Sequence, residues 1–359
     1  MTSNALDSPA TTDPKETEKR QPLYEASTQF RNWRFSPEGL AQIREKLNEA
    51  AVAVIRNTFE VDQPGSSANV AFLNANEEVV LVRLYVTKIS QLCAMFRFPE
   101  EVEATAISYL KRFYLKNTVM DWHPKNVMLT ALFLATKTTN NPISLETYTS
   151  HIPKTAPSDV LDLEFLVAQS LNFEFTIWHA HRALWGIWLD LQSLPDMTSN
   201  LEPSIYDAAL NHIRASRLTD AELIYSPSQI ALTAFSVAAP ELASKWAQSK
   251  LTPDGTQSQL SPDTIPPVLG LIKGMVLKEG HVPDVESVRE IDRRLRICKN
   301  PEKIVGSKAY LAKQAEDERK VEEKRSKKIF EMQKGQTDPF GDEIQTKNLV
   351  DYDDDDDDD

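Results

Sequence analysis

One apolar helical segment occurs twice in the chain, and this repeat constrains the fold more than any other feature. The segment HPKNVMLTALFLATK begins at His123, and SPSQIALTAFSVAAP begins at Ser226. With Pro227 placed over Pro124, the two copies align without a gap at an offset of 103 residues. That offset is the size of a small domain and is too long for a solenoid repeat. The sequence therefore predicts two tandem copies of one domain.

Each copy centres on a helix that the pattern places inside the protein. From Val127 to Ala135 nearly every residue is apolar, without the polar stripe that a surface helix shows. The run is too short to cross a membrane, which needs about 20 apolar residues. The proline that starts each copy suits the first turn of a helix, because its missing N–H costs no hydrogen bond there. With only 10 glycines in 359 residues, the pattern predicts an all-α fold.

Composition argues against several classes of protein. The net charge is −13, but eight aspartates in residues 351–359 supply much of it, so the body of the chain is only mildly acidic. Such a body does not favour a nucleic-acid binder held by phosphate contacts. Cys93 and Cys298 form neither a zinc spacing nor a disulfide framework, which favours a reducing compartment. The first 20 residues lack a hydrophobic segment, and neither a secretory signal nor a membrane span is predicted.

Two further helices are expected outside the repeat. Ser36 can cap a helix with Pro37 at its first position, and an amphipathic stripe continues from there to about residue 56. A second amphipathic stripe covers 284–298. Because neither copy accounts for these stripes, we expect both helices to pack near each other against the first copy. The predicted segments are a disordered N-terminus (1–29), an N-terminal helix and loop (30–75), the first copy (76–175), the second copy (176–280), a C-terminal helix (281–300) and a charged helix-like or disordered tail ending in poly-Asp (301–359).

Helical periodicity and proline positions place the helices within each copy. In the first copy five helices are expected, near 76–96, 100–116, 124–137, 145–151 and 158–171. Ser158 is the expected cap of the fifth. In the second copy helices are expected near 179–194, 203–217, 227–239 and 266–277, with a loop at 252–264.

Glu164 stands out in the fifth helix of the first copy. On a helical wheel it projects from the apolar side, among Val160, Val167 and Leu171. A carboxylate among apolar atoms costs several kcal/mol unless it is paired. Lys137, at the C-terminal end of the central helix, is the candidate partner. Two alternatives stay open: a lysine that only stabilises a helix C-terminus, by roughly 0.3–1 kcal/mol, and a glutamate that faces solvent.

The second copy bears on these alternatives. Pro240 stands where the first copy carries Lys137. A lysine that served only as a helix cap could be used in both copies. The difference therefore favours a specific role for Lys137 and Glu164 in the first copy.

Other chemical motifs are weak. His179 and His181 lack a third ligand at suitable spacing, so no metal site is predicted and they are expected at or near the surface. The tryptophans Trp178, Trp185 and Trp188 have helical spacing and are interpreted as core. No phosphate loop, dinucleotide fingerprint or nucleophile motif is present, so no cofactor and no catalytic residue is expected. The basic cluster of Lys324, Arg325, Lys327 and Lys328 is either a nuclear-import signal or one face of a charged helix.

Several separated segments resemble the cyclin family, and within it the H type. They are YLKRFYLKNTVMDWHPKNVMLTALFLATK from Tyr109, NWRFSPEGL near Trp33, QSLNFEF near Leu171 and LTDAELIYSPSQIALTA from Leu218. The resemblance covers residues 30–300 and implies two tandem cyclin boxes of five helices, with flanking N- and C-terminal helices. Cyclins commonly carry acidic residues after the lysine of the first box, whereas Thr138 follows Lys137 here.

The resemblance also implies a function and a site. In cyclins the lysine and the glutamate of the first box form a buried pair that contacts a cyclin-dependent kinase near its αC helix; the matching positions are Lys137 and Glu164. Phe173 lies on the family's kinase-facing surface. The implied partner is a kinase of the cyclin-dependent kinase 7 type, within TFIIH, with a RING-finger assembly factor. The chain would then be a nuclear regulatory subunit supporting phosphorylation of the RNA polymerase II C-terminal repeats and of other kinases.

Two alternatives remain open from the sequence. One is another transcriptional cyclin, of the C, K or T type, although the segment around Trp33 and Phe35 favours the H type. The other is a TFIIB-like factor with paired cyclin folds, which would need a zinc ribbon and a basic surface for DNA. Neither feature is visible in the sequence, and an enzyme is disfavoured by the missing motifs.

Overall fold

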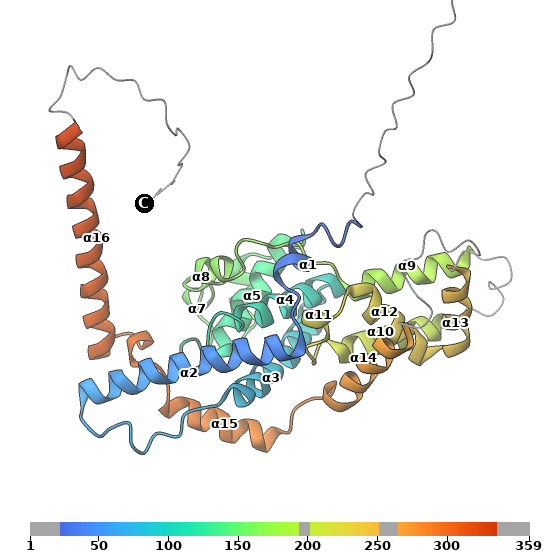
Figure 1. Ribbon diagram of the computed structural model, residues 1–359, viewed down its shortest axis with the longest axis horizontal. Helices are drawn as coiled ribbons and strands as arrows, with labels where there is room; N and C mark the ends of the chain where they lie inside the picture. Colours follow the sequence, from blue (N-terminus) through green and yellow to red (C-terminus); the bar gives the residue numbers. More distant parts are fainter. Residues whose placement is uncertain (1–21, 194–201, 251–264, 336–359) are drawn as a thin grey trace, which may run out of the picture. The chain divides into compact units, whose positions relative to one another are not determined.

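The computed structural model describes residues 22–193, 202–250 and 265–335. Every regular element within these ranges is a helix, which confirms the predicted all-α fold. The chain forms two compact units, of which the first ends at Asn300 and the second begins at Pro301. Both copies of the repeat belong to the first unit, and Figure 1 shows their helices gathered into two neighbouring groups.

The first copy is organised around its central helix, as predicted. Its helices are α3 (Ala75–Phe96), α4 (Glu100–Phe113), α5 (Pro124–Thr138), α6 (Leu145–Ser150), α7 (Ser158–Leu161) and α8 (Glu164–Ser170). The central helix α5 packs against α3, α4, α7 and α8. Every side chain from Val127 to Thr136 is buried, which explains why the segment has no polar stripe.

The second copy repeats this arrangement. Its helices are α9 (Ala180–Gln192), α10 (Pro203–Ser216), α11 (Ala221–Ile224), α12 (Pro227–Ala238), α13 (Pro240–Ser249) and α14 (Ile265–Glu279). The central helix α12 packs against α9, α10, α13 and α14. Thr130 of α5 and Thr233 of α12 occupy equivalent positions, and each donates its hydroxyl to the carbonyl four residues earlier, at 3.0 and 2.8 Å.

Two sequence expectations about helices are wrong in detail. The fifth helix of the first copy is not continuous, because the chain leaves the helix at Asp162 and starts again at Glu164. Ser158 does not cap it: it is the first helical residue, and the preceding residue makes no capping side-chain bond. In the second copy no helix was expected between the central one and the loop at 252–264, yet α13 begins directly at Pro240. The expected loop at 252–264 lies outside the described residues.

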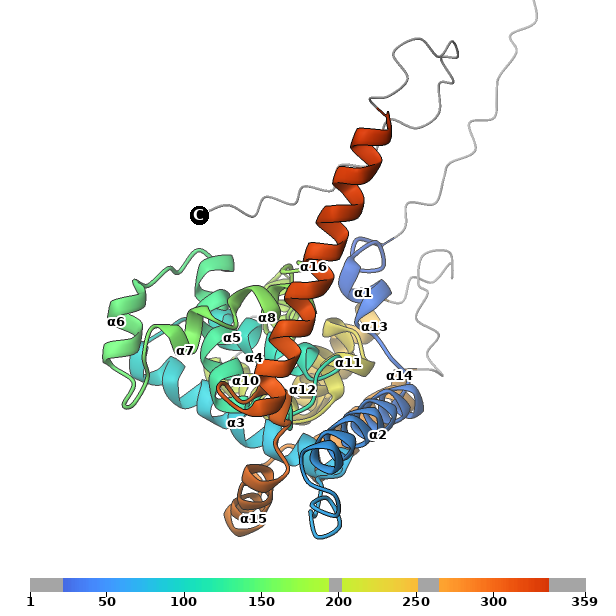
Figure 2. The same cartoon turned by 90° about the vertical axis from the view of Figure 1, so that its left-hand side faces the viewer.

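The two helices outside the repeat flank the first copy. The N-terminal one is α2 (Pro37–Asp62), capped by Ser36 as predicted but longer by about six residues, and the C-terminal one is α15 (Val285–Ile297). Both pack against α3, and Figure 2 shows them bordering that helix. Ile55 of α2 and Ile291 of α15 join the same core as the first copy. The expected packing of each helix against the first copy is therefore present, whereas their expected proximity to each other stays a prediction.

The N-terminal segment is folded where the structure describes it. The disorder predicted for residues 1–29 is wrong from Pro22 onward, and residues 1–21 lie outside the described part. A short helix, α1 (Thr28–Asn32), is capped by Ser27. Gln29 is buried: its side chain donates to the carbonyl of Trp178 at 3.2 Å and accepts from the N–H of Trp178 at 2.7 Å. Composition alone did not indicate this, because the buried polar side chain of Gln29 pairs with the backbone N–H and C=O of Trp178.

One described helix, α3, is long and apolar enough to satisfy a membrane-span criterion, with 22 residues and a peak mean hydropathy of 1.5. Its buried residues include Leu81, Val86 and Ile89, which belong to the core of the first copy. It contacts α2, α4, α5 and α15. Because its apolar side is covered by other helices, its composition is that of a core helix.

The second unit consists of a 3-10 turn (Pro301–Lys303) and a long helix, α16 (Lys308–Gly335). Its side chains from Lys313 to Phe330 are exposed, and ion pairs four residues apart, such as Glu316–Lys320 at 2.6 Å, run along it. Such pairs support an isolated helix by a few tenths of a kcal/mol each. The charged run from Lys308 to Gly335 is therefore a helix. Of the two states expected for it, helix and disorder, the first is observed. The basic cluster 324–328 lies on its exposed surface.

Candidate functional site

Lys137 and Glu164 form an ion pair in the structure. Lys137 lies in the last turn of α5, and Glu164 is the first residue of α8. The lysine Nζ also lies 5.0 Å from the ring centre of Phe133, a cation–π contact. The structure thus brings together the two residues that the sequence singled out, and their role toward another protein stays a prediction.

The surroundings of the pair differ from the sequence expectation. The side chains of Lys137 and Glu164 are 41% and 24% exposed, so the carboxylate is not enclosed by apolar atoms. The break between α7 and α8 is the cause, because it places Glu164 at a helix start instead of on the inner face of a continuous helix. The pair therefore lies at the surface of the unit, where a second protein can reach it.

Phe173 lies close to this pair on an exposed aromatic surface. It is 55% exposed, and its ring centre is 6.1 Å from that of Phe165, which is 69% exposed and follows Glu164 directly. We call Lys137, Glu164, Phe165 and Phe173 the ion-pair face. Large exposed aromatic side chains next to charged ones are typical of a protein-binding surface.

Sequence reasoning missed Phe165. The signal was present: Phe165 lies three residues after Asp162 and four before Gln169, on the side of the helix that those polar residues mark. An aromatic residue on a polar side is a candidate for a contact with another molecule.

The corresponding corner of the second copy is built differently in the residues that the structure describes. Ala239 ends α12 and starts α13 at once, so Pro240, which matches Lys137, is the first residue of another helix. That helix packs back against α12. The corner that carries the ion pair in the first copy is thus covered by the chain itself in the second.

The histidines are structural. His179 is buried, which corrects the expectation of a surface position, and its Nε2 lies 2.9 Å from the hydroxyl of Thr105. It stacks on His181 with ring centres 5.1 Å apart. Burial lowers the pKa of His179 well below its ordinary value, and burial with the nearby Arg217 guanidinium lowers the pKa of His181 to about 4. Among the described residues no group of three or more His, Cys, Asp or Glu side chains could hold a metal ion.

The tryptophan prediction is only partly right. Trp188 is buried in the core of the second copy. Trp185 and Trp178 are about half exposed, so they are not core residues. Trp185 packs its ring edge against Tyr206 at 5.7 Å.

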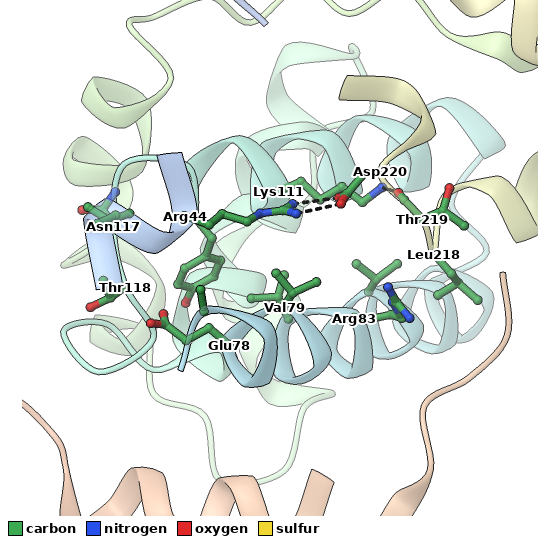
Figure 3. A pocket seen from close by; sticks show the side chains of 15 residues that line it. Arg44, Glu78, Val79, Arg83, Lys111, Asn117, Thr118, Leu218, Thr219 and Asp220 are labelled. Atoms are coloured by element: carbon green, nitrogen blue, oxygen red, sulfur yellow. Dashed lines mark hydrogen bonds and ion pairs between the residues drawn. The ribbon is translucent and has the colours of Figure 1, made fainter. Parts of the chain in front are cut away.

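A pocket lies where α2, α3 and α4 meet the connection between α10 and α11 of the second copy (Figure 3). Arg44 of α2 reaches across it and makes two hydrogen bonds of 2.7 Å to Asp220. The cavity holds about 50 Å³, far below the 300–1,000 Å³ of ordinary small-molecule sites. Its polar side chains serve to join α2 to the second copy.

The described residues thus form two helical bundles in tandem, and the first of them carries the ion-pair face. The family comparison agrees. The profile "Cyclin, N-terminal domain" matches residues 70–176, and the profile "Cyclin C-terminal domain" matches residues 179–331. The chain belongs to the cyclin family. A cyclin is a regulatory subunit and not itself a catalytic enzyme.

Relatives of the chain extend over most of its length. "Cyclin mcs2" of Schizosaccharomyces pombe is 30% identical over 310 residues, which are 84% of this chain and 94% of that protein. "Putative cyclin-H" of Dictyostelium discoideum is 34% identical over 216 residues, 58% of this chain and 73% of that protein. The likeness to the H type that the sequence suggested is confirmed.

Solved structures give the same result. A chain of the CAK complex from Chaetomium thermophilum bound to ATP-gamma-S is 29% identical, with a TM-score of 0.68, over 78% of this chain and 90% of that one. A chain of the yeast TFIIK complex (Kin28/Ccl1/Tfb3) is 27% identical, with a TM-score of 0.58, over 70% of this chain and all of that one. Both similar chains were solved in complexes with other proteins.

Proposed function

We propose that this cyclin binds and activates a cyclin-dependent kinase of the kinase 7 type, as part of the kinase module of TFIIH. The observation that carries the proposal is the exposed ion-pair face of the first copy, whose counterpart in the second copy is the start of α13. The similarity to chains of the CAK and TFIIK complexes supports the choice of partner. The kinase that it activates would phosphorylate the RNA polymerase II C-terminal repeats and other kinases, in the nucleus.

In the proposed mechanism the cyclin holds the αC helix of the kinase in its active position. A protein kinase is active when its β3 lysine pairs with a glutamate of its αC helix, and the position of αC controls that pairing. The core under the ion-pair face is closely packed, since α5 is buried along most of its length. A rigid face of this kind can hold αC inward without supplying any reacting group of its own.

Each residue of the proposed contact has a separate part. Lys137 and Glu164 present opposite charges that stay partly hydrated in the free chain and can pair with polar groups of the kinase. Phe173, with the neighbouring Phe165, presents apolar area that loses water on binding. Interfaces of this type owe most of their affinity to a few aromatic and charged side chains.

Two further partners are proposed with less structural detail. The yeast complex contains Kin28 and Tfb3 besides Ccl1. We infer that the present chain also works with a RING-finger assembly factor and with the TFIIH core. Affinity purification of the full chain from its own cells, with identification of the bound proteins by mass spectrometry, tests this. A kinase of another class as the main partner would contradict it.

The test of the site uses a matched pair of variants. Lys250 of the second copy is a good control, because it is 40% exposed, pairs with Asp190 and lies over the ring of Trp246 at 5.8 Å, much as Lys137 lies over Phe133. We expect Lys137→Ala to lower kinase activation roughly tenfold, as loss of an interface hot spot does. Lys250→Ala should leave activation unchanged, and both variants should melt like the unmodified chain. Equal activation by the two variants would contradict the site.

A further inference from the structure

The turn that carries Phe173 has an unusual backbone. Asn172 and Phe173 are consecutive residues with positive φ, of 53° and 56°. This left-handed region is costly for a bulky side chain such as phenylalanine, and residues stay in it only when their surroundings fix them. The groups that hold residues 171–175 therefore decide where the Phe173 ring points.

The residue after Phe173 is held by the N-terminal segment. The carboxylate of Glu174 accepts a hydrogen bond from Asn32 Nδ2 at 2.6 Å and another from Trp33 Nε1 at 2.5 Å. Asn32 is the last residue of α1, and Trp33 follows it as the helix cap. Two residues about 140 positions away in sequence thus fix the backbone next to Phe173, with hydrogen bonds to a charged group, which are the stronger kind.

Trp33 is itself a rigid anchor. Its side chain is 2% exposed. The guanidinium of Arg112 lies 4.7 Å from its ring centre, and the Nζ of Lys116 lies 5.3 Å from it. Trp33 is also buried in a small apolar cluster with Leu40 and Leu223, so its indole N–H is held toward Glu174 by packing as well as by these two cations.

Asn172, the residue before Phe173, is held by Lys116, which also contacts the Trp33 ring. Lys116 Nζ donates to the side-chain oxygen of Asn172 at 2.6 Å. On the other side, the hydroxyl of Tyr109 donates to the carbonyl of Phe175 at 2.8 Å. Phe173 therefore stands between two fixed points, with its backbone N–H bonded to the carbonyl of Ala168 at 3.0 Å.

We infer that Glu174 is a positioning residue, through which the N-terminal helix α1 sets the orientation of Phe173 and hence the degree of kinase activation. This inference rests on the proposed function. The N-terminal segment acts on the kinase through this turn, by reducing the number of conformations that the ion-pair face samples before binding. A fixed face loses less conformational entropy when the kinase binds.

The first measurement needs no kinase. 4-Fluorophenylalanine is placed at position 173 of the full chain, and its ¹⁹F NMR signal is compared between the unmodified chain and Glu174→Ala. We expect the variant to shift and broaden the signal, because the turn then samples other backbone regions. Trp33→Phe, which keeps the ring beside Arg112 but removes the indole N–H, should change the signal in the same direction. A signal that Glu174→Ala leaves unchanged would overturn the inference.

The second measurement uses the full chain in its kinase complex. We expect Glu174→Ala to lower kcat roughly fivefold while the KM for a substrate peptide stays the same, since loss of orientation in an active complex is costly. Glu174→Gln keeps one carbonyl acceptor and should recover part of the loss. The combined variant Trp33→Phe with Glu174→Ala should be no worse than Glu174→Ala alone, because both remove the same contact.

The outcomes separate this inference from the proposed function. Unchanged kcat in Glu174→Ala, together with an altered ¹⁹F signal, would overturn the coupling of α1 to activation. Lys250→Ala, far from the turn, controls for general effects and should change neither readout. If Lys137→Ala activates the kinase fully, the proposed role of the ion-pair face in activation fails, whatever the ¹⁹F signal of Glu174→Ala shows.

Discussion

The Lys137–Glu164 pair contributes little to the stability of the free chain. Ion pairs that remain hydrated are worth at most about 1 kcal/mol, and the lysine side chain is 41% exposed. The same pair becomes far more important when a partner removes its water, because charges interact more strongly in a low dielectric. Its variants should therefore affect binding and activation far more than folding.

The buried histidines give a pH prediction at the scale of single residues. His179 and His181 have lowered pKa values in the folded chain, through burial first, and then through His181 in the case of His179 and through Arg217 in the case of His181. In the unfolded chain they take up protons near pH 6.5. Below that pH the unfolded state binds more protons, so stability falls as the pH is lowered from 6.5 toward 4.

The measurement is the free energy of unfolding by urea at pH 7 and pH 5. We expect His181 to account for a loss of about 1–2 kcal/mol between these values. Replacing both histidines, in His179→Gln with His181→Gln, should flatten this part of the slope. Carboxylates such as Glu100, whose pKa is lowered, are present in the unmodified chain and in the double variant. They therefore contribute equally to the pH dependence of both. An identical slope in the two proteins would contradict the prediction.

At the level of elements, the sequence placed the helices well but not every break. The repeat, the capping serines and the proline starts predicted α5 and α12 nearly to the residue, and the start of α2 but not its end. The break between α7 and α8 has no glycine or proline to announce it. It coincides with a contact from α5: the hydroxyl of Thr130 shares its one proton between the carbonyls of Asn126 and Val160, at 3.0 and 2.9 Å. In a continuous helix that carbonyl would accept from the N–H of Glu164.

The helix α13 was missed for a related reason. Pro240 marks a difference from Lys137 of the first copy, but it is also the first residue of a helix that was not expected before the loop at 252–264. Ala239 caps α13 without a side-chain hydrogen bond, so Pro240 at the first helical position is not accompanied by a capping residue. The pairing of Lys137 and Glu164 could be predicted because the two copies could be compared. The exposure of Glu164 could not be predicted, because it depends on a contact between helices that lie apart in the sequence.

The N-terminal helix gives a prediction about stability. Arg44 of α2 makes a two-fold contact with Asp220 of the second copy, and the two side chains are 18% and 22% exposed. Removing Arg44 leaves a largely buried carboxylate without its main partner. We expect Arg44→Ala to lower the free energy of unfolding by about 1–3 kcal/mol.

The control is an arginine of the other flanking helix. Arg293 of α15 pairs with Glu290, but its side chain is 71% exposed. Arg293→Ala should change the free energy of unfolding by less than about 0.5 kcal/mol. Urea unfolding of the two variants compares them directly, and equal effects would contradict the view that α2 joins the two copies.

At the scale of the molecule, two copies of one bundle have come to differ in what they expose. In the first, α5 ends at the surface with Lys137, and α1 and α2 of the N-terminal segment brace the nearby turn and the junction with the second copy. In the second, α13 covers the equivalent corner. The asymmetry explains how one copy can offer a binding face while the other serves to support it.

Hydrogen–deuterium exchange of the full chain, alone and bound to its kinase, measures this asymmetry most directly. Binding should slow exchange at the C-terminal end of α5, through α8 and across residues 171–175, and leave the junction of α12 and α13 unchanged. Protection confined to the second copy, with exchange around Lys137 and Glu164 unaltered, would contradict the central claim.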